Sequence, residues 1–231
     1  MFKWVTKKGS TIRLVKVGIT NCYLVKTVNN AILIDTGQKR KVDKLTSFLK
    51  AYSDHQLKLD YLILTHTHYD HTQNANQIKK LYSLKVIVHQ KEADFLKAGF
   101  TTLPKGTTFL TDFISSMGNK YASSIGKYSP VTPDIEFKDN YQLQDDQSIK
   151  LIHTPGHTIG SISILIDDEI AIVGDTLFGI LPNKILPPFA DDKNELIKSW
   201  KKLSDTNCDL FLPAHGKVIN RKLLERELET R

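Results

Sequence analysis

The chain has 231 residues, of which 40% are hydrophobic and 25% are charged, with 32 Lys and Arg against 25 Asp and Glu. This composition excludes an intrinsically disordered chain, and with only two cysteines, Cys22 and Cys208, it excludes a disulfide framework. No apolar run reaches the roughly 18 residues that cross a bilayer. We therefore expect a cytoplasmic protein that does not insert into membranes, with both cysteines buried as small hydrophobic side chains.

The positive charge is concentrated at the N-terminal end of the sequence. Residues 1–60 carry 12 Lys and Arg against 4 Asp and Glu, whereas residues 61–231 carry 20 against 21. A basic segment of this kind is typical of a solvated lysine-rich face, and it also suits contact with nucleic acid. Because the sequence has no aromatic or zinc-finger motif of nucleic-acid binding, we expect a solvated face. A non-enzymatic nucleic-acid-binding module is kept as an alternative.

Apolar runs of strand length alternate with segments of helical periodicity, which is typical of an α/β fold. The expected strands cover residues 11–17, 22–28, 31–34, 61–64, 85–89, 148–153, 161–166, 170–173 and 209–212. The expected helices cover residues 42–52, 72–82, 92–97, 109–121, 194–203 and 221–229. We expect a single domain over residues 1–231, with a loosely patterned insert at about 100–139.

One short stretch, THTHYDH at residues 65–71, concentrates side chains that bind metals. In an extended backbone His66, His68 and Asp70 project to the same side, because strand side chains alternate with a period of two. A turn into a helix would bring His71 close to Asp70, where it can serve a second centre. Imidazole and carboxylate groups are ligands of zinc and related ions, and four of them buried without a metal are difficult to satisfy. The stretch therefore predicts a metal site.

Three later residues share one sequence context, because each lies just beyond a short apolar strand. They are His157, Asp175 and His215. Sites in open α/β sheets form beyond the carboxyl ends of strands, so we expect these side chains to meet at one edge. The small residues Gly156 and Gly174 would let the backbone pass close to a crowded centre.

The remaining histidines lie outside this pattern. We expect His55 on the solvated surface, and His89 and His153 in the core or behind the ligands. We expect Tyr69 to point outward or to pack, and not to donate a proton.

Together, the HxHxDH stretch and the segments TPGHT at 154–158, GDT at 174–176 and PAHG at 213–216 resemble the metallo-β-lactamase-fold hydrolase superfamily. The segment DTG at 35–37 also resembles the N-terminal signature of that family. The resemblance implies an αβ/βα sandwich of two mixed β-sheets flanked by helices, with two metal ions at one edge.

The resemblance also implies which side chains hold the metals. The implied ligands are His66, His68 and His157 for the first ion, Asp70, His71 and His215 for the second, and Asp175 as a bridge. Asp35 would orient one of these ligands from behind. We expect two divalent ions and consider zinc first. Manganese, iron and cobalt also suit these ligands, in different degrees.

Two such ions can share a water molecule and lower its pKa toward about 7. We expect the bridging hydroxide to attack an ester, thioester or lactone carbonyl of a small molecule, with Asp70 and Asp175 as catalytic carboxylates. The segment GDTLF at 174–178 resembles thioester hydrolases of the glyoxalase II type, whereas quorum-signal lactonases commonly carry tyrosine where this sequence has Phe178. The sequence does not indicate the substrate or the oligomeric state.

Other reactions fit the same ligands. One alternative is a phosphodiesterase or nuclease, and another is a mononuclear iron thiol or persulfide dioxygenase, which needs only two histidines and a carboxylate. The apolar loop at 178–189 has two interpretations: the wall of an acyl or lactone pocket, or packing against the insert helix.

Overall fold

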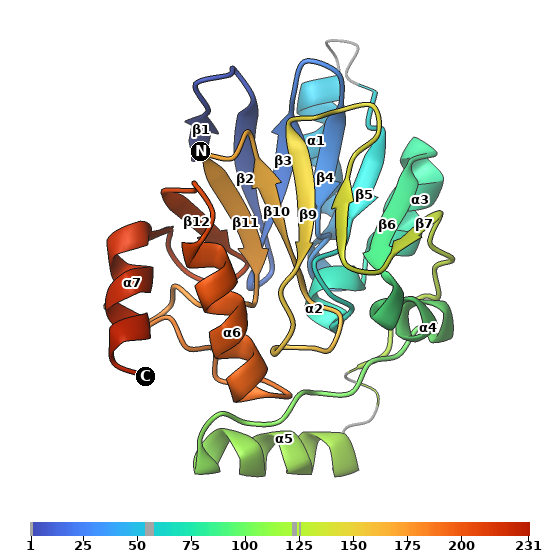
Figure 1. Ribbon diagram of the computed structural model, residues 1–231. Coiled ribbons are helices and arrows are strands. Elements are labelled where there is room, and N and C mark those ends of the chain that lie inside the picture. The colour runs from blue at the N-terminus through green and yellow to red at the C-terminus, as the bar shows by residue number, and fades with distance from the viewer. Residues whose placement is uncertain (1, 54–57, 122–123, 125) are drawn as a thin grey trace.

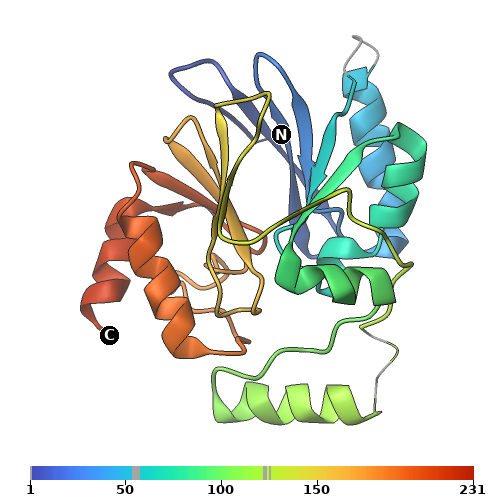
Figure 2. The same cartoon turned by 45° about the vertical axis from the view of Figure 1, so that its right-hand side comes forward.

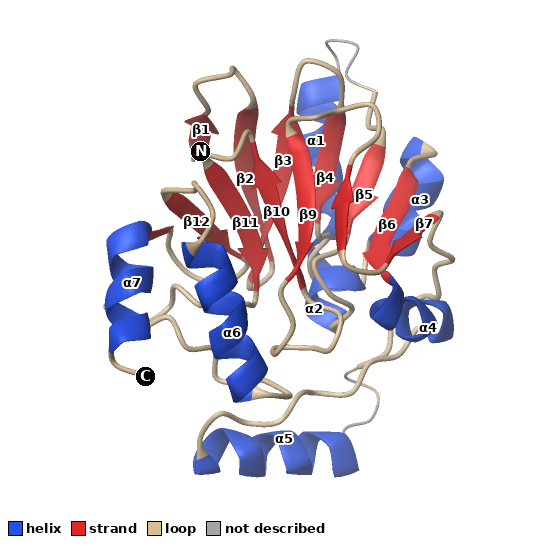
Figure 3. Ribbon diagram, viewed as in Figure 1, coloured by secondary structure: helices blue, strands red, loops and turns tan. Residues whose placement is uncertain are grey.

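Two β-sheets face each other, and helices cover the outer face of each (Figures 1 and 2). The computed structural model describes residues 2–53, 58–121, 124 and 126–231. Over these residues one sheet has seven strands and the other has six (Figure 3). The predicted αβ/βα sandwich of two mixed sheets is confirmed.

The seven-stranded sheet follows the order of the sequence, from β1 to β7. Its strands are β1 (Lys3–Val5), β2 (Thr11–Val17), β3 (Thr20–Lys26), β4 (Ala31–Ile34), β5 (Tyr61–Ile63), β6 (Lys85–His89) and β7 (Ile135–Phe137). Strands β1 to β4 pair antiparallel, whereas β4 to β7 pair in parallel, which requires crossover connections. These connections carry the 3-10 helix η1 (Lys39–Lys41) and the helices α1 (Val42–Ser53), α2 (Tyr69–Thr72), α3 (Ala75–Tyr82), α4 (Gln90–Ala98) and α5 (Phe109–Tyr121).

The six-stranded sheet has the order β13-β12-β11-β10-β9-β8. Its strands are β8 (Asn140–Gln142), β9 (Ile149–His153), β10 (Ile162–Ile166), β11 (Ile170–Gly174), β12 (Leu210–Pro213) and β13 (Ile219–Asn220). Neighbouring strands are antiparallel except β11 and β12, which are joined through α6 (Lys193–Ser204). The last helix is α7 (Arg221–Glu229).

The core is layered because strand side chains alternate between two faces. On β4, Ile32 and Ile34 belong to the cluster between the sheets, which also includes Ile164 of β10. Leu33 of the same strand belongs to the outer cluster, which α1, α3 and α4 cover. A strand that is covered on both faces has a continuous apolar sequence, so the burial of every residue of β4 follows from its place in the sandwich.

Helix α5 departs from this packing, because its apolar side is turned outward. The exposed apolar side chains are those of Phe109, Leu110, Phe113, Ile114 and Met117. Its inner side carries small residues instead: Ser115 is buried and donates to the Pro104 carbonyl at 2.6 Å, and a Cβ on Gly118 would lie 2.7 Å from Leu103. The helix predicted over 109–121 is present, and its apolar side does not pack on the sandwich.

The structure corrects one predicted helix and adds four strands. The helix expected over 72–82 begins only at Ala75, as α3, and Thr72 instead ends the separate short helix α2. Between the two helices the Asn74 side chain donates to the carbonyls of Thr36 and Gly37. The strands β1, β7, β8 and β13 have only two or three residues, which is too short for an apolar alternation to be recognised in the sequence.

Cys22 and Cys208 are both fully buried, as predicted. His55 lies outside the residues that the structure describes. Within the described ranges, no helix has the length and apolar content needed to cross a membrane. The single domain over 1–231, its insert at about 100–139 and the cytoplasmic location stay predictions.

Candidate metal centre

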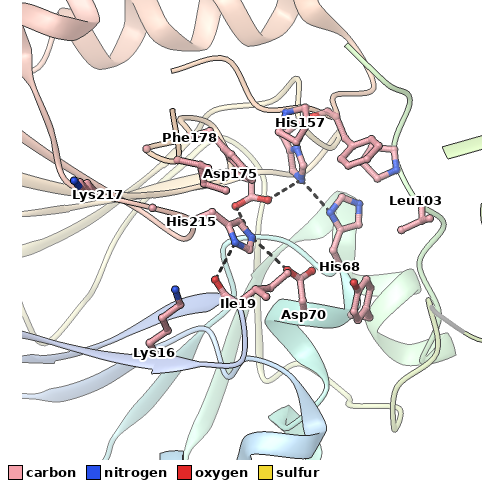
Figure 4. A pocket seen from close by; sticks show the side chains of 17 residues that line it. Lys16, Ile19, His68, Asp70, Leu103, His157, Asp175, Phe178, His215 and Lys217 are labelled. Atoms are coloured by element: carbon pink, nitrogen blue, oxygen red, sulfur yellow. Dashed lines mark hydrogen bonds and ion pairs between the residues drawn. The ribbon is translucent and has the colours of Figure 1, made fainter. Parts of the chain in front are cut away.

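Segments that follow four strands converge at one edge of the sandwich and carry every predicted ligand. They are His66, His68, Asp70 and His71 after β5, His157 after β9, Asp175 after β11 and His215 after β12. Figure 4 shows the side chains of His68, Asp70, His157, Asp175 and His215 pointing toward one another. At the end of β11, Gly174 has φ +52° and a Cβ there would lie 2.8 Å from the Thr65 side chain, so the two ligand-bearing segments approach closely.

All seven side chains are buried. Their ligand atoms form three groups, each with atoms within 4.8 Å of one another: His66, His68 and His157; His66, His71 and Asp175; and Asp70, His71 and His215. The structure therefore brings together all the residues that the sequence assigns to one site, and each group could hold a metal ion.

The two oxygens of Asp175 face histidines on different sides of the cluster. Its Oδ2 is 3.4 Å from Nε2 of His157, whereas its Oδ1 is 3.6 Å from Nε2 of His71 and 3.5 Å from Nε2 of His215. One carboxylate thus offers one oxygen to each side of the cluster, which is the arrangement that two neighbouring cations can share.

Asp35 supports the 65–71 loop from behind. Its Oδ1 accepts a hydrogen bond from the Thr65 backbone N–H at 2.9 Å, and its Oδ2 accepts one from the Thr65 hydroxyl at 2.8 Å. The same Oδ2 lies 2.8 Å from Nδ1 of His71. A hydrogen bond at Nδ1 leaves Nε2 free to act as a ligand and fixes the orientation of the ring. The orienting position expected for Asp35 is therefore present.

Backbone carbonyl groups orient two further rings. Nδ1 of His157 lies 2.9 Å from the Phe189 carbonyl, and Nδ1 of His215 lies 3.1 Å from the Ile19 carbonyl. In both residues Nε2 is the atom that faces the cluster. The tautomers are thereby set for ligation through Nε2.

Burial and charge act differently on the histidines of the cluster. Burial lowers the pKa of His66 and of His68, and neighbouring imidazoles add to the effect. Burial also acts to lower the pKa of His71, but the surrounding carboxylates outweigh it and raise that pKa. For Asp70 and Asp175 burial acts to raise the pKa, and the adjacent histidines hold it below its usual range. The ionised carboxylates and the neutral rings of His66 and His68 are thus in the forms that bind metal, whereas the raised pKa of His71 favours a proton that a metal ion would displace.

Three buried polar atoms of the cluster have no hydrogen-bond partner within the part of the chain that the structure describes, which bears on whether a metal fits. Nε2 of His66, Nε2 of His71 and Oδ1 of Asp175 are buried without a hydrogen-bond partner among the described residues. A buried unpaired polar atom costs about 1–3 kcal/mol. A cation among these atoms would satisfy all three, and nitrogen and oxygen donors of this kind are those that zinc prefers. The residues fit a metal centre.

A cavity of 690 Å³ opens onto the cluster. Its apolar lining consists of Ile19, Leu103, Pro104, Phe178, Ile180, Pro188 and Phe189. The 178–189 loop thus forms part of the wall, and it also pairs with the segment before α5, where the Thr107 N–H donates to the Pro188 carbonyl at 2.9 Å. Tyr69 also lines the cavity.

The sequence profile of the metallo-beta-lactamase superfamily matches residues 15–215. The chain belongs to the metallo-β-lactamase superfamily. A protein of Methanocaldococcus jannaschii named probable metallo-hydrolase MJ0888 is 27% identical over 205 residues, which are 87% of this chain and 90% of that protein. The predicted family is confirmed, and with it the assignment of the chain as a metal-dependent hydrolase of this superfamily.

Two further proteins are similar to the chain. The atrochrysone carboxyl ACP thioesterase of Aspergillus fumigatus is 25% identical over 203 residues, which are 87% of this chain and 51% of that protein. The crystal structure of the superfamily member ST1585 from Sulfolobus tokodaii matches with a TM-score of 0.68 and 23% identity, covering 95% of this chain and 85% of the other. This structural similarity shows the fold.

Some residues around the metal centre cannot be found from the ligand motifs. His89 is buried and its ring stacks on that of half-buried His153, and neither ring belongs to the cluster. Lys16 and Lys217 line the cavity, and Glu92 is buried behind two ligand loops. The residues that these side chains contact are distant in sequence. Only Lys217 could be suspected from the sequence, because it lies two residues after the ligand His215.

Proposed function

We propose that the chain is a dinuclear metal-dependent hydrolase that cleaves an ester, thioester or lactone of a small molecule carrying an apolar acyl group. The observation that carries the proposal is the position of Asp175, whose two oxygens face different ligand groups at 3.4 to 3.6 Å. Hydrolysis adds water across the C–O or C–S bond and releases an acid and an alcohol or thiol.

In this proposal the ligands divide as the family resemblance implies: His66, His68 and His157 would hold one ion, Asp70, His71 and His215 would hold the other, and Asp175 would serve both. When bound, two divalent ions supply an ionised water as nucleophile and polarise the scissile carbonyl. Asp70 and Asp175 act as the catalytic carboxylates by staying ionised beside the reacting atoms, and Asp35 keeps His71 oriented toward them. Zinc is the first choice, with manganese, iron and cobalt as alternatives.

The cavity supports an acyl substrate over a phosphodiester. Leu103, Phe178 and Phe189 present apolar surface next to the cluster, which suits an acyl chain, and the ammonium groups of the described lining are limited to Lys16 and Lys217. A thioester is the first member of this class to test, because the Aspergillus fumigatus relative is named a thioesterase.

The proposal is tested by elemental analysis together with turnover of hexanoyl thioesters, esters, lactones and phosphodiesters. We expect two divalent ions per chain and hydrolysis of the acyl compounds. Asp175→Ala and His68→Ala should each lose metal and lower turnover by about 100-fold or more, since each removes a ligand. Asp175→Asn keeps the side-chain shape and should also lose metal, which separates ligand loss from misfolding.

The matched control is Asp94→Ala, which removes an exposed aspartate of α4 and should keep both metal and turnover. Unchanged turnover after loss of both ions would contradict the proposal. One iron per chain with oxygen consumption would instead support the dioxygenase alternative.

A further inference from the structure

Two lysines lie at the cavity beside the metal centre. Lys16 and Lys217 both contribute to its lining, and both side chains are exposed. In the described part of the chain neither ammonium group pairs with a carboxylate. The carboxylates that line the cavity are Asp70 and Asp175, whose oxygens face histidines of the cluster. The two cations are therefore available to a ligand.

The backbone holds these two lysines on segments that are bonded to each other. Lys16 of β2 pairs with Asn21 of β3. The Asn21 side chain donates to the carbonyl of Gly216 at 3.1 Å, and its backbone N–H donates to the carbonyl of Ala214 at 2.7 Å. Lys217 directly follows this anchored segment. The relative placement of the two lysines is thus fixed by hydrogen bonds within the fold.

A second contact locks the backbone of Lys217. Its N–H donates to the Gly179 carbonyl at 2.9 Å, and the Gly179 N–H donates to the His215 carbonyl at 2.9 Å. A Cβ on Gly216, which has φ +89°, would lie 2.1 Å from the backbone of Gly179, so only glycine permits this approach. Lys217 is therefore held next to a ligand and next to the loop that follows Asp175.

The cavity has unlike ends. Figure 4 shows Lys16 and Lys217 on one side of the cluster and Leu103 on the opposite side. Apolar side chains line both sides, with Leu103 on one and Ile19 and Phe178 on the other, but the two ammonium groups lie on one side only. A substrate whose carbonyl lies at the cluster would therefore place one end against apolar side chains and the other end near two cations.

We propose that Lys16 and Lys217 bind an anionic group on the leaving-group side of the substrate, while the acyl chain lies against the apolar wall. This inference rests on the proposed hydrolysis and narrows its substrates to amphiphilic acyl compounds whose released thiol or alcohol carries a carboxylate or a phosphate. The unpaired cations would draw such substrates toward the metal centre and hold them in one orientation.

The test compares thioesters that share a hexanoyl group and carry different groups on the thiol side, with the metal-loaded enzyme. The probes are the S-hexanoyl derivatives of 3-mercaptopropionate, of 2-mercaptoethyl phosphate and of the neutral 3-mercaptopropanamide. We expect kcat/KM for the better anionic probe to exceed that for the amide by about tenfold, mainly through KM, and the ratio between the two anions to identify the group. Lys16→Gln and Lys217→Gln should each reduce the preference about threefold, since exposed ion pairs contribute less than about 1 kcal/mol and the two effects together make up the tenfold preference.

Lys26→Gln is the matched control, because it removes the same charge from the opposite end of β3 and should keep the preference. Binding is measured in parallel by calorimetry with 3-(hexylthio)propionate and its amide, which cannot be hydrolysed. Equal binding of the two thioethers, or a preference that survives in both lysine variants, would overturn the inference. A lysine-dependent preference in thioether binding, without hydrolysis of any thioester, ester or lactone, would support the anion subsite and refute the proposed reaction.

Discussion

Glu92 is the residue that connects the two loops from which the first ligand group is built. It is buried on α4, and its Oε2 accepts hydrogen bonds from the backbone N–H and the hydroxyl of Thr67. Its Oε1 accepts from the Thr158 hydroxyl at 2.7 Å and from the Gly160 N–H at 3.1 Å. Thr67 lies between His66 and His68, and Thr158 follows His157. A group that only accepts hydrogen bonds is required here, because all four partners donate.

We expect Glu92→Gln to lower both the stability of the fold and its affinity for metal, although glutamine has nearly the same shape as glutamate. The amide N–H₂ would face two donors and leave them unsatisfied, at a cost of about 2 kcal/mol in the free energy of unfolding. We expect metal affinity, measured by competition with a chelator, to fall about tenfold as the two loops separate. Glu195→Gln, which affects only a surface pair with Lys198, is the control. If both variants behave alike, Glu92 has no positioning role.

At the scale of elements, the sequence predicts what is encoded locally and misses what depends on distant contacts. The buried runs of β4 and β10 and the periodicity of α7 are visible because each is determined by its own residues. The division of α2 from α3 is not visible, because it depends on Asn74 reaching carbonyls more than thirty residues away. The ligands of the site can be predicted, because their positions directly after strand ends are encoded locally. Glu92 and Lys16 cannot be predicted in this way, because their roles depend on contacts that are distant in sequence.

Helix α5 shows the same limit, since its periodicity predicts a helix and its apolar stripe predicts burial, yet the stripe faces outward. We expect the double variant Phe109→Ser with Phe113→Ser to change the melting temperature by less than about 2 °C, because exposed side chains bury little area. Phe211→Ala, which empties a fully buried position of β12, should cost about 3–5 kcal/mol. A loss of several degrees in the double variant would show that the α5 face is covered in solution.

On the scale of the whole molecule, two histidines join the sheets. His89 ends β6 in the seven-stranded sheet and His153 ends β9 in the six-stranded sheet, and their rings stack at 4.0 Å with an angle of 10° between planes. Burial lowers the pKa of His89 to about 4, and the positive charges of protonated His153 and of Lys91 add to this effect. The backbone contact to Lys138 and the charge of Asp139 oppose it. The stack is therefore stable only while the ring of His89 is neutral.

The pH dependence of folding follows from this stack. The pKa of His89 is about 4 in the folded chain and about 6.5 in the unfolded chain, so only the unfolded chain takes up this proton between those values. The contribution of neutral His89 to the free energy of unfolding is fully present above about pH 6.5 and is lost as the pH falls toward 4. About 1–2 kcal/mol of it is lost by pH 5. Urea unfolding of metal-free wild type and His89→Gln at pH 7.5 and pH 5 measures it. Because the histidines of the metal centre titrate in both proteins, the difference in pH dependence isolates His89, and identical pH dependence in the two would contradict the prediction.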